Sequence, residues 1–270
     1  MGGVDQGHGA EGGSHGVGTM SYKFCTETDT GRVRHNNEDA AVVDASLGLA
    51  VLADGMGGYN AGEVASGMAT QLICHQLVHW LSQRPADLAG ADIRLAMQTC
   101  IDQVNQSILN LARQEVQYAG MGTTLVVAVF LRNLLVLGHI GDSRCYRWRQ
   151  GHFMQITRDH SLLQAHIDAG VLTPQQAAVS SQKNLITRAL GVEAQVVLEL
   201  NEYWVEANDV YLMCTDGLSD MVSDADISAI LAQPVPLAQQ AQRLIELANA
   251  NGGRDNITVL LVQAPSGHDG

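Results

Sequence analysis

The stretch Leu49-Ala50-Val51-Leu52-Ala53-Asp54-Gly55-Met56-Gly57-Gly58 carries the pattern on which the fold prediction depends. Its first five residues are an apolar run, and a run of this length that ends at turn residues predicts a β-strand. Asp54-Gly55 predicts a turn, where a backbone carbonyl is exposed and a hard cation can approach. The end of this strand is therefore a candidate metal-binding position.

Other parts of the chain repeat the pattern of short apolar runs bounded by turn residues. Strands are predicted at 41–43, 124–131, 134–140, 196–200, 210–214 and 258–262. Arg132-Asn133, between two of these runs, predicts a hairpin. Residues 172–188 have few apolar anchors and predict a mobile flap.

Helical spacing of apolar residues predicts two long amphipathic helices, followed by shorter ones near the C-terminus. The predicted ranges are 61–83, 91–116, 224–231 and 237–250. Another helix is expected to begin at Asp159 or Ser161, which are both suitable N-cap residues. Strands, two consecutive helices and then strands again favour packed antiparallel sheets flanked by helices over a parallel doubly wound sheet.

Three further aspartates lie in equally tight contexts. They are Asp39 in Arg34-His35-Asn36-Asn37-Glu38-Asp39, Asp216 in Thr215-Asp216-Gly217, and Asp255 in Arg254-Asp255-Asn256. Each alone is also an ordinary turn or cap. Together with Asp54 they predict one site for Mg²⁺ or Mn²⁺, because these cations prefer carboxylate and carbonyl oxygens.

Seven ordered blocks between Thr28 and Val262 resemble the type 2C metal-dependent protein phosphatases, the PPM family. They are Thr28-Asp29-Thr30-Gly31-Arg32-Val33-Arg34, Asp54-Gly55-Met56-Gly57-Gly58, Gly122-Thr123-Thr124, Gly141-Asp142-Ser143-Arg144, Thr157-Arg158-Asp159-His160-Ser161, Asp216-Gly217 and Arg254-Asp255-Asn256-Ile257-Thr258. The resemblance implies an α+β fold, an αββα sandwich, in a single catalytic domain over residues 21–265. Its metal site would lie in a cleft where loops from both sheets meet.

The resemblance also implies roles for the aspartates and the turn glycine. Asp54 would bridge two Mg²⁺ or Mn²⁺ ions, Asp216 and Asp255 would complete the first site, and the carbonyl of Gly55 would join the second. Asp142, together with Asp216, would bind a third and weaker metal. The alternative for Asp142 is a turn cap.

Three residues near the N-terminal block have roles outside direct metal binding. By resemblance, Glu38 and Asp39 would hold water molecules of the metal site. Arg34 offers a planar fork that matches two phosphate oxygens, and it is a candidate catalytic residue with Asp54. The alternative for Arg34 is a surface ion pair with Glu38.

Met56 departs from the animal members of the family, which carry a histidine here as the proposed proton donor to the leaving oxygen. Methionine has no proton to donate. Bacterial members commonly share the methionine, so the resemblance still implies activity. The identity of the general acid is left open.

These observations predict a bacterial protein serine/threonine phosphatase that acts on phosphorylated proteins and opposes a eukaryotic-like kinase. The presence of Arg34 argues against the stress-response branch that acts on anti-sigma antagonists, since those relatives usually lack this arginine. A catalytically dead scaffold is disfavoured because the core carboxylates are all present. A two-metal nuclease is disfavoured because no basic groove is evident.

Composition limits the remaining alternatives. The 270 residues are 46% hydrophobic, enough for one large domain and also compatible with two small ones. The net charge of -13 opposes binding to nucleic acid or anionic membranes. No run approaches the length of a membrane span, so we expect a soluble, cytoplasmic monomer. Residues 1–20, rich in glycine with two histidines, are expected to form a disordered tail.

The spacing of the cysteines and histidines does not indicate a cysteine-based active site or a zinc protease motif. The five cysteines include no Cys-x-x-Cys pair, which favours a reducing compartment and buried thiols. None has an arginine six positions later, so a cysteine-based phosphatase is disfavoured. His75 and His79 are four residues apart on a predicted helix, but the glutamate of a zinc protease motif is missing between them.

Overall fold

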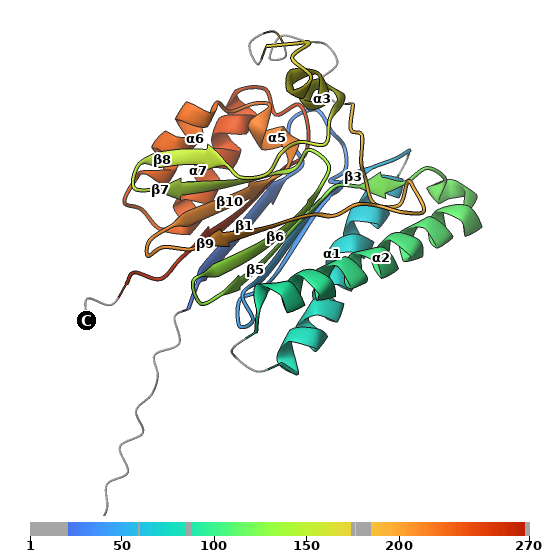
Figure 1. Cartoon of the computed structure of the whole chain (residues 1–270). Helices are drawn as coiled ribbons and strands as arrows, with labels where there is room; N and C mark the ends of the chain where they lie inside the picture. Colours follow the sequence, from blue (N-terminus) through green and yellow to red (C-terminus); the bar gives the residue numbers. More distant parts are fainter. Residues whose placement is uncertain (1–20, 59, 85–87, 174–175, 177–184, 268–270) are drawn as a thin grey trace, which may run out of the picture.

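The computed structural model describes residues 21–58, 60–84, 88–173, 176 and 185–267. Two antiparallel sheets pack face to face, and helices cover both outer surfaces (Figure 1). The expected αββα sandwich is confirmed. The predicted tail (1–20) and most of the predicted flap (172–188) lie outside the described residues.

The first sheet has the strand order β1-β11-β10-β7-β8, and the second has the order β2-β3-β5-β6-β9. The strands of the first sheet are β1 (Lys23–Asp29), β7 (Arg144–Arg149), β8 (His152–Gln155), β10 (Val210–Cys214) and β11 (Ile257–Gln263). Those of the second are β2 (Asp39–Asp44), β3 (Leu49–Met56), β5 (Leu125–Leu131), β6 (Leu134–Ile140) and β9 (Glu199–Trp204), and the short β4 (Gly122–Thr123) pairs with the end of β3.

Two long helices, α1 (Ala61–Ser82) and α2 (Gly90–Gln114), cover the second sheet, and a single 3-10 turn follows at Val116–Tyr118. The first sheet is covered by α5 (Asp216–Ser219), α6 (Asp224–Leu231) and α7 (Leu237–Ala250). The short α3 (Leu162–Asp168) lies at one end of the sandwich (Figure 1). No helix in these described ranges is both long and apolar enough to cross a membrane.

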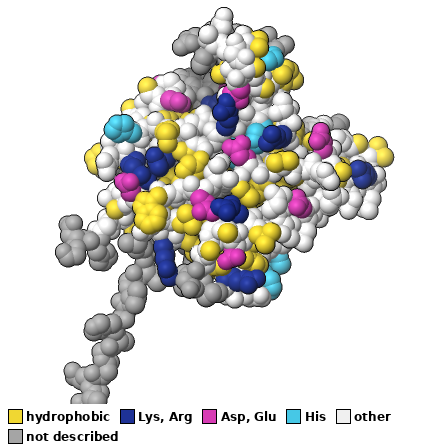
Figure 2. All heavy atoms as spheres, viewed as in Figure 1, with side chains coloured by type: hydrophobic (Ala, Val, Ile, Leu, Met, Phe, Trp, Pro, Cys, Tyr) yellow, Lys and Arg dark blue, Asp and Glu magenta, His cyan; other side chains and the backbone are white. Residues whose placement is uncertain are grey.

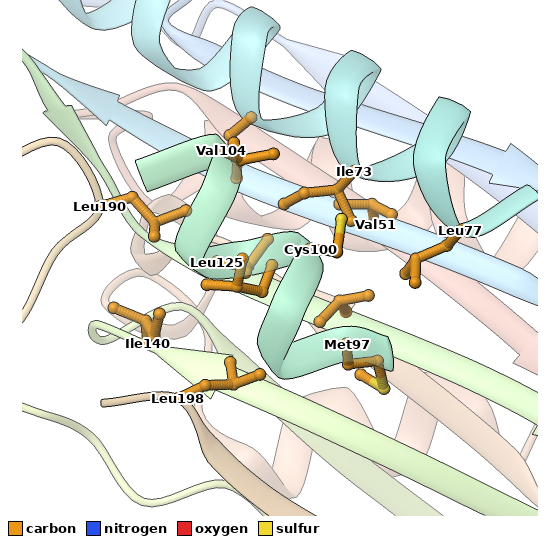
Figure 3. Close-up of a cluster of buried hydrophobic side chains, with 14 of the residues drawn as sticks. Val51, Ile73, Leu77, Met97, Cys100, Val104, Leu125, Ile140, Leu190 and Leu198 are labelled. Atoms are coloured by element: carbon orange, nitrogen blue, oxygen red, sulfur yellow. The ribbon is translucent and has the colours of Figure 1, made fainter. Parts of the chain in front are cut away.

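Strand β3 is apolar on both faces because it lies between two cores. Leu49, Val51 and Ala53 face α1 and α2, whereas Ala50 and Leu52 face the other sheet. All five are fully buried, as the alternation of side chains along a strand requires. Figure 3 shows Val51 in one cluster with Ile73 and Leu77 of α1 and with Met97 and Cys100 of α2.

The strand predicted at 196–200 is displaced in the structure. β9 spans Glu199–Trp204 and pairs with β6, with Glu199 opposite His139 and Trp204 opposite Leu134. The apolar residues before it pack or lie exposed instead of pairing, and Val197 is 67% exposed. β9 is an edge strand, and an edge strand tolerates the polar residues that conceal it in the sequence.

Strands β1, β7 and β8 were not predicted, because none contains a continuous apolar run. β1 and β8 are the edges of the first sheet, and much of β1 is exposed. β7 and β8 form a hairpin around Gln150 and Gly151, which both have positive φ angles, 49° and 82°. Such a two-residue turn is a hairpin connection.

The remaining predictions agree closely with the structure. The four predicted helices correspond to α1, α2, α6 and α7, and Arg132-Asn133 connects β5 to β6. Ser161, not Asp159, caps α3, and its Oγ accepts the N–H of Gln164 at 3.2 Å. All five cysteines are free thiols; three are buried and the other two half-buried.

Candidate active site

Carboxylates from both sheets meet at one end of the sandwich. Asp39 begins β2 and lies directly opposite Asp54 of β3. Asp216 begins α5 just after β10, and Asp255 precedes β11. The charges of Asp39, Asp216, Asp142 and Asp255 all raise the pKa of Asp54, which places these groups within one electrostatic cluster.

Main-chain contacts hold Asp54 and Gly55 in place. The N–H of Asp54 donates to Thr124 Oγ1 at 2.9 Å, and its carbonyl accepts from the Thr124 N–H and from Thr123 Oγ1, both at 2.9 Å. Gly55 packs so closely against α1 that a Cβ would lie 2.0 Å from the carbonyl oxygen of Gly62. A side chain at position 55 would therefore push the end of β3 away from the helix.

Asp39 provides the clearest observation that the site suits a cation. Its Oδ2 accepts from Thr215 Oγ1 at 2.8 Å and from Thr258 Oγ1 at 2.7 Å. Its Oδ1 is buried and has no hydrogen-bond partner. Burial raises the pKa of Asp39 to about 7, and the two threonine hydroxyls oppose this shift. A buried carboxylate oxygen without a partner fits a hard divalent cation or its bound water.

Three other carboxylates of the site also have raised pKa values. Part of Asp54 and of Asp216 is accessible to solvent, but protein surrounds most of each side chain, and this burial raises both pKa values well above the usual range. Neighbouring carboxylates add to both shifts. Burial, with the charge of Asp159, raises the pKa of Asp142 to about 6. Bound Mg²⁺ or Mn²⁺ would supply positive charge to these buried carboxylates.

Asn256 fixes the N-terminal loop against Asp255. Its Oδ1 accepts the N–H of Glu38 at 2.8 Å, and its Nδ2 donates to the carbonyls of Thr30 and Asn36 at 3.0 and 2.9 Å. The loop is thus held where Arg34 can reach Asp255. Asn256 was predicted only as part of a turn, because its partners lie more than 200 residues away along the chain.

Arg34 pairs with Asp255, not with Glu38 as the alternative interpretation required. Its guanidinium donates to Asp255 Oδ2 at 2.8 Å. The side chain is 49% exposed, so the rest of the guanidinium faces solvent at the rim of the site. Burial raises the pKa of Glu38, whose carboxylate lies beside Gly62 at the start of α1.

Asp142 is buried at the end of β6, and sequence analysis missed one neighbour of it. Asp220 lies four residues after Asp216, at the end of α5, and its charge raises the pKa of both Asp142 and Asp216. The spacing of four residues, which places two side chains on one face of a helix, was the available signal.

A second group of metal-binding residue types lies away from the aspartates. Among the described residues, His139, His160 and Glu199 have ligand atoms within 4.8 Å of one another. However, His160 Nδ1 accepts the N–H of Gly141 at 3.1 Å, so Nε2 carries the proton and donates to Glu199 at 3.2 Å. This proton pairs His160 with Glu199 and would have to leave Nε2 before a metal could bind there.

The histidines predicted on the first long helix do not belong to any group of three metal-binding residues in the part of the chain that the structure describes. His75 and His79 are exposed on α1, and His79 Nε2 lies 3.0 Å from Nε2 of Gln83. Neither belongs to the converging group described above.

Comparison with known proteins identifies the family. Residues 31–261 match the model of the family described as protein phosphatase 2C. The chain belongs to the protein phosphatase 2C family. This phosphatase is 38% identical over 239 residues to serine/threonine phosphatase stp of Listeria innocua serovar 6a. The aligned residues are 87% of the chain and 93% of that relative.

A second relative of this phosphatase is longer. Serine/threonine protein phosphatase PstP of Mycobacterium tuberculosis H37Rv is 43% identical over 244 residues, which are 90% of the chain but 45% of PstP. The chain therefore spans about half the length of PstP.

Solved structures agree with the sequence relatives. The crystal structure of Mycobacterium tuberculosis PstP/Ppp aligns with a TM-score of 0.81 at 40% identity and covers 91% of this phosphatase and 100% of that chain. The PstP catalytic domain in complex with two manganese ions aligns with a TM-score of 0.80 at 40% identity. This alignment covers 92% of this phosphatase and 100% of the PstP chain. Family membership and fold are thus confirmed together, and the two manganese ions are those of the PstP structure.

Proposed function

We propose that this protein is a metal-dependent phosphatase that hydrolyses phosphoserine and phosphothreonine in proteins. The observation that carries the proposal is the cluster of buried carboxylates at the end of the sandwich, with Arg34 at its rim. A site built this way in a protein phosphatase 2C chain binds divalent cations and a phosphate group beside them.

The residues that would hold the cations lie in and beside the carboxylate cluster. Asp54, Asp216, Asp255 and the carbonyl of Gly55 would hold two Mg²⁺ or Mn²⁺ ions. Asp142, with Asp216, would hold a third and weaker ion. When bound, such ions neutralise phosphoryl charge and lower the pKa of water enough to make it a nucleophile.

The remaining candidate residues position water molecules and bind the substrate. Glu38 and Asp39 position water at the edge of the carboxylate cluster, and the unpartnered Oδ1 of Asp39 supports this role. Arg34 binds the phosphate of the substrate, since it is exposed while Asp255 holds it in place. Met56 has no proton to give, so another group protonates the leaving oxygen.

The partners of such an enzyme follow from its chemistry. We infer that its substrates are proteins phosphorylated by a serine/threonine kinase of the same bacterial signalling pathway, and that it acts in the cytoplasm as a monomer. Figure 2 shows Lys and Arg interspersed with Asp and Glu on the viewed face, and the chain has a net charge of -13. Both observations argue against nucleic acid and anionic membranes as partners.

The test is phosphate release from phosphothreonine and phosphoserine peptides by the purified chain. We expect release with Mn²⁺ or Mg²⁺, none with excess chelator, and recovery when metal is added back. Asp54→Asn, which keeps the shape of the side chain, should lower turnover at least about 100-fold, because several kcal/mol of charge stabilisation are lost.

Two results would contradict the proposal. One is full activity in the presence of chelator. The other is cleavage of plasmid DNA by the same metal-loaded preparation without any phosphatase activity, which would favour a nuclease.

A further inference from the structure

A groove with a volume of about 570 Å³ lies beside the strand that carries Asp54 and Gly55. It is lined by Met56, residues 185–189, 192–193 and 195–197. Among the described residues, this lining is mainly aliphatic, and its two charged members, Arg188 and Glu193, have opposite signs. Aliphatic side chains that line a groove suit an uncharged apolar group.

Three aliphatic side chains around this groove are unusually accessible. Leu185, Val192 and Val197 are 51%, 55% and 67% exposed. Contact with an apolar partner would remove this surface from water, which is favourable.

Met56 connects the groove to the carboxylate cluster. It is the last residue of β3, two positions after Asp54, and alternate residues of a strand lie on the same face. Met56 and Val192 both lie close to Gly122, where an added Cβ would lie 2.8 Å from Val192 Cγ2 and 3.1 Å from Met56 Cε. The absence of a side chain at Gly122 therefore leaves room for both side chains.

The far wall of the groove is fixed relative to the site by main-chain hydrogen bonds. Thr123 and Leu190 exchange two such bonds, of 3.0 and 2.9 Å, and Thr123 lies opposite Gly55 in the pairing of β4 with β3. Nearer the start of this wall, the N–H of Thr187 donates to the carbonyl of His160 at 2.8 Å. A side chain bound in the groove would thus lie at a set distance from the carboxylates.

We propose that this groove binds an aliphatic side chain of the substrate, two residues away from the phosphorylated serine or threonine. The proposal rests on the proposed function, which places the phosphate at the carboxylate cluster. A substrate segment in extended conformation repeats its side-chain direction every second residue, as β3 does between Asp54 and Met56. With the phosphorylated residue over Asp54, the side chain two positions away lies over Met56.

The experiment uses phosphothreonine peptides that carry Leu or Ala at each position from three residues before to three residues after the phosphothreonine. We expect kcat/KM to be about 10-fold higher with Leu than with Ala at one of the two positions that lie two residues away, the size typical of an aliphatic pocket. A preference for Leu at another position, or at none, overturns the proposal.

Groove variants localise the effect. Val192→Asp and Val197→Asp should each reduce the ratio of kcat/KM for the Leu and Ala peptides to about one, because an aspartate disfavours an apolar neighbour. Val116→Asp is the matched control, since Val116 is 91% exposed and does not line the groove, and it should keep the wild-type ratio. The ratio is taken within each variant, so a general loss of folded or active protein cancels. A groove variant that keeps the wild-type ratio overturns the proposal.

Hydrolysis of p-nitrophenyl phosphate by the wild-type protein separates this proposal from the proposed function. The small ester reaches the carboxylate cluster without filling the groove. If it is hydrolysed and no preference for Leu appears, the groove proposal alone fails. If the wild-type protein with Mn²⁺ hydrolyses neither this ester nor any peptide, the proposed function fails, and the groove proposal falls with it.

Discussion

The main-chain N–H of Gly141 donates to Nδ1 of His160 at 3.1 Å, and the N–H of His160 donates back to the carbonyl of Gly141 at 2.8 Å. This reciprocal pair fixes the residue before Asp142. It also determines which nitrogen of His160 carries the proton. The buried ring of His139 lies against that of His160 at a tilt of 33°, with 4.7 Å between ring centroids, and burial lowers the pKa of His139 to about 3.

Replacement of His160 tests this contact. Asn can place a side-chain oxygen where Nδ1 lies, whereas Gln reaches toward Glu199 and loses the acceptor for Gly141. We expect His160→Gln to lower the free energy of unfolding by about 1–3 kcal/mol, because a buried N–H loses its partner. His160→Asn should lose less. Denaturant unfolding measures both, and equal losses would show that the contact with Gly141 contributes nothing.

The same two variants test whether His160 positions Asp142. If the Gly141 contact orients the Asp142 loop, His160→Gln should need more Mn²⁺ than His160→Asn for half-maximal turnover of a phosphopeptide. If the role of His160 is purely structural, His160→Gln should be less stable, but its folded molecules should need the same Mn²⁺ concentration for half-maximal turnover.

Arg34 is expected to bind the ground-state phosphate. Arg34→Ala should raise KM for phosphopeptides more than it lowers kcat, since uniform binding is expressed in KM. The charged contact contributes about 1.5–3 kcal/mol, which corresponds to about 10- to 100-fold in kcat/KM. Steady-state kinetics measure this change, with Arg94→Ala on α2, a half-buried arginine paired with Glu202, as the control. Unchanged kinetics in Arg34→Ala would show that the arginine only pairs with Asp255.

Asp142 is expected to affect turnover more than the binding of the first two cations. Asp142→Asn should still bind two Mn²⁺ ions in a calorimetric titration but lose most activity in single-turnover assays with a phosphoprotein. If Asp142 is only a strand-end cap, the variant should lose about 0.5–2 kcal/mol of stability and keep its activity. Normal turnover would therefore refute the third-metal role.

The pKa values of the carboxylate cluster predict how the metal-free protein responds to pH. Asp39 and Asp142 have folded pKa values of about 7 and about 6, above the ordinary value of 3.8 that applies to the unfolded chain. At a pH between the unfolded and the folded pKa values, the folded state binds more protons than the unfolded state. Stability therefore falls as pH rises from about 4 to 7.

The melting temperature of the chelated protein should accordingly be higher at pH 5.5 than at pH 8, by about 2–4 °C for each 1 kcal/mol of difference. Saturating Mn²⁺ should remove most of the loss at pH 8. Asp39→Asn should flatten the pH dependence, and Glu115→Gln, at an exposed carboxylate outside the cluster, should not. Greater stability of the chelated protein at pH 8 would contradict the shifted pKa values.

Local sequence determined the strands, helices and caps that a few neighbouring residues specify. The run Leu49–Ala53 specified a strand because five consecutive apolar residues need two buried faces, and Asp54-Gly55 specified its end. The long helices were evident from their spacing, and Ser161 from its capping side chain. Most candidate site residues could be named for the same reason, since each lies in a turn beside a predicted strand.

Tertiary structure alone decided which of these residues meet. Thr215 and Thr258, 176 and 219 residues from Asp39, hold its carboxylate, and Asp255 rather than Glu38 takes Arg34. The edge strands β1 and β8, and the true bounds of β9, became evident only from strand pairing, because these edge strands contain no continuous apolar run. Propensity acts over a few residues, whereas these contacts depend on how two sheets are stacked, and that stacking brings distant strand ends to one place.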